Sequence, residues 1–120
     1  MTTQDDPLVE AQTNAEQMLS NARQALESTD PDQTQAHLHD AVRFGEQART
    51  FLEEALDSLS DERALLHAEE ALDFVEDALD EASQALLSSE SAMREHVKQM
   101  SVHAERAASE IEQVFGIGMA

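Results

Sequence analysis

Apolar residues recur along the whole chain in alternating steps of three and four positions, the spacing of a helix that buries one face. The pair Ala-Leu recurs at Ala25, Ala55 and Ala85, thirty residues apart each time. A serine follows each pair two positions later. This spacing predicts four helical segments of nearly equal length that are joined by short turns.

Capping residues predict where these segments begin and end. Asp6 and Asp30 each precede a proline, and this order suits an N-cap followed by the first helical residue. Ser60 is the expected cap of the third segment, and the fourth should start between Ser89 and Ser91. Gly116 and Gly118 would end the last helix. We therefore expect helices over about residues 7–28, 31–57, 60–87 and 90–115, and a frayed tail over 116–120.

Each segment carries a seam of mostly small residues beside a stripe of larger ones. The seams of the first two segments are Leu8, Ala11, Ala15, Met18, Ala22, Ala25 and Leu38, Ala41, Gly45, Ala48, Leu52, Ala55. Those of the last two are Ala64, Ala68, Ala71, Val75, Ala78, Ala82, Ala85 and Met93, Val97, Met100, Ala104, Ala107, Ile111, Val114. The larger stripe comprises Leu19, Leu26, Val42, Leu56, Leu65, Leu72, Leu79 and Leu86. We expect the seams to allow close helix approach and the larger stripe to fill the centre.

The seam pattern predicts an all-α fold. A seven-residue repeat of Ala-Leu in the third segment favours coiled-coil-like Ala/Leu packing with crossing angles near about 20°. Short turns make successive helices antiparallel, so residues 1–120 should form one domain, an antiparallel up-down-up-down four-helix bundle. No Gly or Pro lies between Gly45 and Gly116. The alternative is therefore one long helix through residues 87–91, which would give an elongated helical hairpin dimer.

Charge adds a prediction about habitat. The chain has 26 acidic and 7 basic residues, a net charge of −19, and Lys98 is its single lysine. Such self-repulsion destabilises a compact state at low ionic strength, whereas molar salt shortens the Debye length to about 3 Å. Excess acid with almost no lysine resembles the composition of cytosolic proteins from extreme halophiles. We therefore expect adaptation to high salt.

The same composition disfavours several classes of partner. Nucleic-acid phosphates and anionic membranes both attract basic surfaces, so neither is expected as a direct partner. No apolar run approaches the roughly 20 residues of a spanning helix, and the N-terminal residues lack the pattern of a secretion signal. These features predict a cytoplasmic protein without membrane contact. No small-molecule substrate is evident.

The histidines offer little recognisable chemistry. None of the five has another histidine three or four positions away, and none follows a glutamate by three, so helical metal motifs are missing. His67 with Glu70 and His37 with Asp40 are interpreted as surface pairs. His96, His103 and Glu110 follow one another at intervals of seven residues, beside the seam of the fourth segment. They are interpreted either as an ordinary flank of that seam or as an edge that meets a partner. We predict no catalytic, cofactor-binding or metal-binding residue.

The predicted function is therefore non-enzymatic: a small acidic helical protein that acts through contact with another protein or through self-association. One alternative is a histidine phosphotransfer-like signalling domain, which residues 36–45 faintly resemble, although they lack the expected lysine and Asp40 would repel a phosphoryl group. The other is an acidic mimic of nucleic acid that binds a basic protein, with residues 61–87 as its acidic surface. Phe44 and Phe51 are either core residues or a docking stripe.

Overall fold

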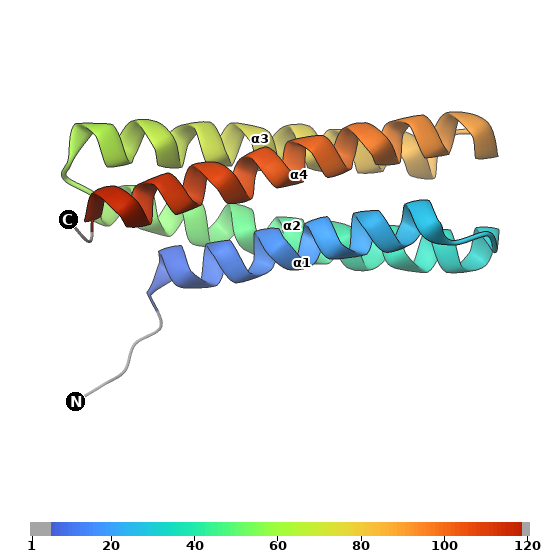
Figure 1. The fold of residues 1–120 in the computed structure, drawn as a ribbon, viewed down its shortest axis with the longest axis horizontal. Helices are drawn as coiled ribbons and strands as arrows, with labels where there is room; N and C mark the ends of the chain where they lie inside the picture. Colours follow the sequence, from blue (N-terminus) through green and yellow to red (C-terminus); the bar gives the residue numbers. More distant parts are fainter. Residues whose placement is uncertain (1–5, 119–120) are drawn as a thin grey trace.

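The computed structural model describes residues 6–118, which form an up-down-up-down four-helix bundle (Figure 1). The helices are α1 (Pro7–Glu27), α2 (Pro31–Ser58), α3 (Glu62–Leu86) and α4 (Glu90–Gly118). The particle measures 46 × 29 × 19 Å. Within the described residues, no helix is both long enough and apolar enough to cross a membrane.

Aspartates cap the first three helices. The carboxylate of Asp6 accepts a hydrogen bond from the Leu8 amide at 2.9 Å, and that of Asp30 accepts one from the Asp32 amide at 3.0 Å. Asp61, rather than the predicted Ser60, caps α3, because its carboxylate accepts from two amides of the first turn at 2.8 and 3.1 Å. These contacts satisfy N–H groups that have no partner inside the helix.

A tight turn separates α3 from α4. The amides of Leu87 and Ser88 donate to the carbonyls of Gln84 and Ala85, both at 3.2 Å, and α4 begins at Glu90. The alternative of one continuous helix through residues 87–91 is therefore wrong. Helix α4 also continues to Gly118, past the predicted end at residue 115. The part of the predicted frayed tail over residues 119–120 lies outside the described residues.

The four helices form a ring of neighbours. The most extensive interfaces lie within the two hairpins, α1 with α2 and α3 with α4, whereas α1 with α4 and α2 with α3 share smaller interfaces. Figure 1 shows the α3–α4 hairpin stacked on the α1–α2 hairpin. Helix α1 therefore lies diagonally opposite α3, and the outer faces of these two helices are well separated.

The predicted seams form the core. Every seam residue is buried, and the largest fully buried side chains are Met18, Leu38, Leu52, Met100, Ile111, Val75, Val97 and Val114. The prediction that the larger stripe fills the centre is wrong. Of that stripe, Leu79 is buried and the others are partly buried around the seams. The small seam residues bring the helices so close together that the seam itself occupies the axis.

Gly45 lies at the tightest point of this core. A Cβ atom added there would be 2.7 Å from Met18 Sδ and 2.8 Å from Leu79 Cδ2, so side chains from α1 and α3 converge on the α2 backbone. Protein interiors are packed so densely that one additional methyl group changes the stability of the fold. The absence of a side chain at residue 45 therefore permits the close approach of three helices.

Candidate functional site

The α3–α4 edge brings together polar side chains that are far apart in sequence. Antiparallel packing places positions spaced by seven on α3 opposite positions spaced by seven on α4. The pairs that face each other are His67 with Glu110, Phe74 with His103, and Glu81 with His96. Three of the five histidines thus line one edge of the bundle.

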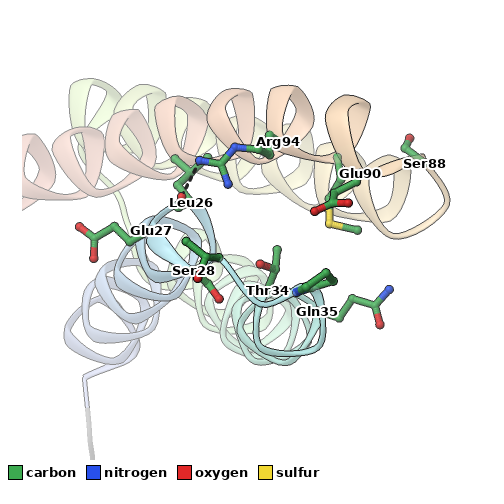
Figure 2. Close-up of a pocket in the computed structure, with 11 residues that line it drawn as sticks. Leu26, Glu27, Ser28, Thr34, Gln35, Ser88, Glu90 and Arg94 are labelled. Carbon is green, nitrogen blue, oxygen red and sulfur yellow. Dashed lines mark hydrogen bonds between the residues drawn. The ribbon is translucent and has the colours of Figure 1, made fainter.

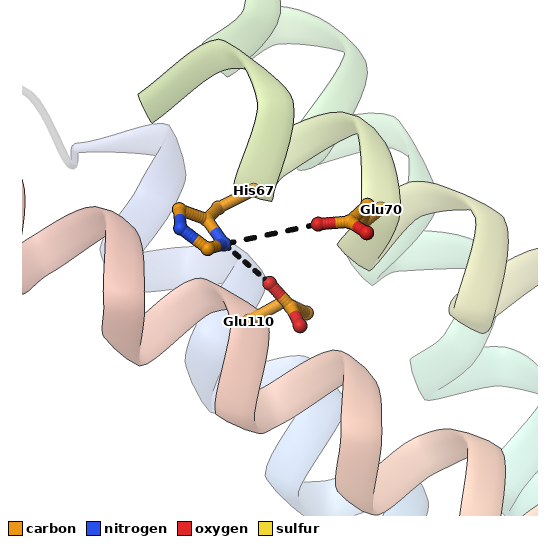
Figure 3. Close-up of side chains that lie close together, drawn as sticks. All are labelled: His67, Glu70 and Glu110. Carbon is orange, nitrogen blue, oxygen red and sulfur yellow. Dashed lines mark hydrogen bonds and ion pairs between the residues drawn. The ribbon is translucent and has the colours of Figure 1, made fainter. Parts of the chain in front are cut away.

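His67 is the centre of a three-residue cluster (Figure 3). Its Nδ1 lies 2.5 Å from Glu110 Oε1 across the interface and 3.8 Å from Glu70 Oε1 one turn along α3. The His67 and Glu110 side chains are 28% and 24% exposed, and Glu70 is 49% exposed. The cluster is therefore half-buried, with one open side toward solvent.

The other two pairs lack such a third group. His96 Nδ1 lies 2.8 Å from Glu81 Oε1, with exposures of 29% and 24% that nearly equal those of His67 and Glu110. Phe74 stacks against His103 with ring centroids 6.3 Å apart. Nδ1 of His103 is buried without a hydrogen-bond partner among the described residues.

Helix α3 carries an exposed acidic surface. We call five neighbouring unpaired carboxylates of this helix the acidic face: Glu69, Asp73, Glu76, Asp77 and Asp80. All five are exposed, and none forms an ion pair with any residue between positions 6 and 118. Two cations of the other helices are directed elsewhere, because Arg23 pairs with Glu105 and Arg43 pairs with Asp40.

A pocket of about 500 Å³ opens at the end of the bundle where both hairpin turns lie (Figure 2). Leu26, Thr34 and Met93 are among its lining residues, and Arg94 crosses it to donate to the Leu26 carbonyl at 2.7 Å. This hydrogen bond satisfies a carbonyl in the last turn of α1 and ties α4 to α1. The contacts of Arg94 are thus structural, and they leave its guanidinium committed to the backbone.

The histidines of α2 are remote from this edge. His39 is exposed and His37 is partly buried on α2, away from the α3–α4 interface. The carboxylate of Asp40 forms its ion pair with Arg43, at 3.3 Å. Phe44 and Phe51 are partly buried and pack against the core. Among residues 6–118, neither His37 nor His39 forms a side-chain hydrogen bond or an ion pair.

No protein-family model, curated protein or solved structure matches this chain. Functional inference therefore depends on the geometry of the chain itself.

The sequence reasoning identified the pair of His67 and Glu70 but missed Glu110 as its third member. A signal was present in the spacing. Residues at equal distances on either side of the turn between α3 and α4 must face each other in an antiparallel hairpin, and His67 and Glu110 satisfy this condition. The pairing depends on the position of the turn between α3 and α4. The sequence did not fix that position, because the segment around residues 87–91 is rich in serine and has no Gly or Pro.

Proposed function

We propose that the protein is non-enzymatic and acts by binding another protein, with the acidic face of α3 as its contact surface. The partner would be a protein with a basic surface, of the kind that otherwise binds nucleic-acid phosphates. The observation that carries this proposal is the exposure of five carboxylates on one helix face without an ion pair among the described residues.

Electrostatics supports a cationic partner. Carboxylates three or four positions apart on a helix repel one another by about 0.2–0.5 kcal/mol per pair. Asp73 has such neighbours at Glu69, Glu70, Glu76 and Asp77. Arginine or lysine side chains of a partner would relieve this repulsion and form charge-assisted hydrogen bonds. Binding of a basic partner would therefore release more electrostatic free energy at the acidic face than at a surface whose charges are already paired.

The interior supports a role without catalysis. Its buried polar residues among the described positions are Asn14 and Thr34. Asn14 donates to the Glu10 carbonyl at 2.8 Å, and Thr34 donates to the Asp30 carbonyl at 3.2 Å. Both bonds serve local backbone structure. Enzymes usually hold their chemistry in a polar cluster within a concave site, and the described core offers apolar packing instead.

We also propose that the protein is adapted to high salt, on the support of its net charge of −19 and single lysine. At molar salt the Debye length is about 3 Å, so attraction would be confined to groups in direct contact. Under those conditions the partner would be selected because its cationic side chains lie opposite the carboxylates of the acidic face. Long-range electrostatic steering would contribute little.

The experiment is a quantitative capture from lysate of the native host. Wild-type protein would be compared with a variant neutralised on α3: Glu69→Gln, Asp73→Asn, Glu76→Gln and Asp80→Asn. A matched control removes the same charge from exposed acids elsewhere: Glu16→Gln, Glu46→Gln, Glu53→Gln and Glu54→Gln.

The proposal expects a captured basic protein that the α3 variant loses and the control variant retains. Equal capture by all three proteins would refute the acidic face as the contact surface. Recovery of this chain alone, with dimers in light scattering that survive neutralisation of α3, would favour self-association instead.

A further inference from the structure

We propose that His67, Glu70 and Glu110 bind one divalent transition-metal ion of the zinc class and that this ion joins α3 to α4. The inference is independent of the proposed binding function. It depends on three ligand-type side chains from two helices whose donor atoms all lie within 4.8 Å of one another.

The distances are close to those of a metal centre. Two ligands that each lie about 2.0 Å from a tetrahedral Zn²⁺ are separated from each other by about 3.3 Å. The distance of 2.5 Å between His67 Nδ1 and Glu110 Oε1 would have to open by less than about 1 Å. The distance of 3.8 Å between His67 Nδ1 and Glu70 Oε1 would have to shorten by about 0.5 Å. Small rotations of the Glu70 and Glu110 side chains would supply both changes.

The donor set selects the class of metal. One imidazole nitrogen and two carboxylates suit Zn²⁺, and also Co²⁺, Mn²⁺ or Fe²⁺, whereas Mg²⁺ and Ca²⁺ prefer oxygen ligands alone. The partial exposure of all three side chains leaves room for water to complete the coordination shell. A metal ion at Nδ1 requires that nitrogen to be unprotonated, so the proton of the neutral His67 ring would lie on Nε2.

The surrounding charge favours a cation. Asp73 lies one turn beyond Glu70 on the same helix, and the other residues of the acidic face also belong to α3. Negative potential raises the local concentration of cations near such a surface. This attraction alone is non-specific, so a test must separate it from coordination by His67.

The chain contains its own control for that purpose. The pair of His96 and Glu81 joins the same two helices with the same pair of residue types and nearly the same burial. Among the described residues, only the cluster at His67 brings three such donors together. A metal ion held by coordination should therefore depend on His67 and not on His96.

The experiment is a calorimetric titration of the folded protein with Zn²⁺ in about 1 M potassium nitrate, where screening suppresses the general acidic field. The variants are His67→Ala, Glu110→Gln and, as the matched control, His96→Ala. Circular dichroism before each titration verifies that helix content is unchanged. Co²⁺ provides a second readout, because its visible absorption reports coordination number and does not require calorimetric heat.

We expect one Zn²⁺ ion per chain in the wild type. Loss of a direct ligand should weaken binding by about tenfold or more, since even outer partners of a metal site contribute 10–100-fold. Removal of His96 should change affinity by less than about twofold. The proposal is overturned if wild type and His67→Ala bind Zn²⁺ equally, if His96→Ala weakens binding as much as His67→Ala, or if wild-type Co²⁺ shows only the spectrum of the hydrated ion.

Discussion

The acidic face should limit the stability of the protein in dilute buffer, and Asp73→Asn tests this most sharply. Asp73 is exposed and has acidic residues at all four positions that are three or four residues away on α3. Each like-charge pair costs about 0.2–0.5 kcal/mol at low ionic strength, so removing one charge should stabilise the protein by about 1 kcal/mol. For a domain of this size, that corresponds to a rise in Tm of about 4 °C.

The assay is thermal unfolding followed by circular dichroism, in dilute buffer and in about 1 M KCl. In molar salt the gain from Asp73→Asn should nearly vanish, because the repulsion is already screened. Glu16→Gln on α1 is the control, since Glu16 is exposed and has no charged residue three or four positions away. An equal gain at both salt concentrations, or the same gain for Glu16→Gln, would refute the electrostatic reasoning.

Four further substitutions test the packing and one hydrogen bond between helices, each by urea unfolding. Gly45→Ala should destabilise the protein by about 1 kcal/mol, because overpacking among three helices costs more than the better helix propensity of alanine gains. Gly116→Ala is the control: an added Cβ would have no atom within 4 Å, so this substitution should stabilise the protein slightly. Leu52→Ala should cost about 3 kcal/mol, since Leu52 is fully buried; a cost below about 1 kcal/mol would contradict its central position. Arg94→Met should cost about 1 kcal/mol through the lost hydrogen bond to the Leu26 carbonyl, and no loss would mean that water replaces it.

The sequence predicted the burial pattern because helical periodicity is local information. All seam residues from Leu8 to Val114 are buried, and the caps at Asp6 and Asp30 form as expected. The error at the start of α3 has a local cause: Ser60 and Asp61 are both good caps, and the aspartate reaches two amides.

Features that depend on the distance between helices were less predictable. The larger stripe was expected at the centre, but small seam residues draw the helices together and leave Leu19, Leu26 and Leu72 at the flanks. Likewise, the meeting of His67 with Glu110 requires both the position of the turn and the antiparallel register. Each residue alone has an ordinary appearance in the sequence, and only the fold places them in contact.

Whether the acidic face of α3 contacts a partner protein is tested most directly by site-specific photo-crosslinking in the native host. A photoreactive amino acid would be placed at residue 73 on α3 or at residue 16 on α1, which lies diagonally opposite. We expect a discrete adduct with a basic protein from position 73 and none from position 16. Adducts from position 16 alone, or the same adducts from both positions, would contradict the proposed contact.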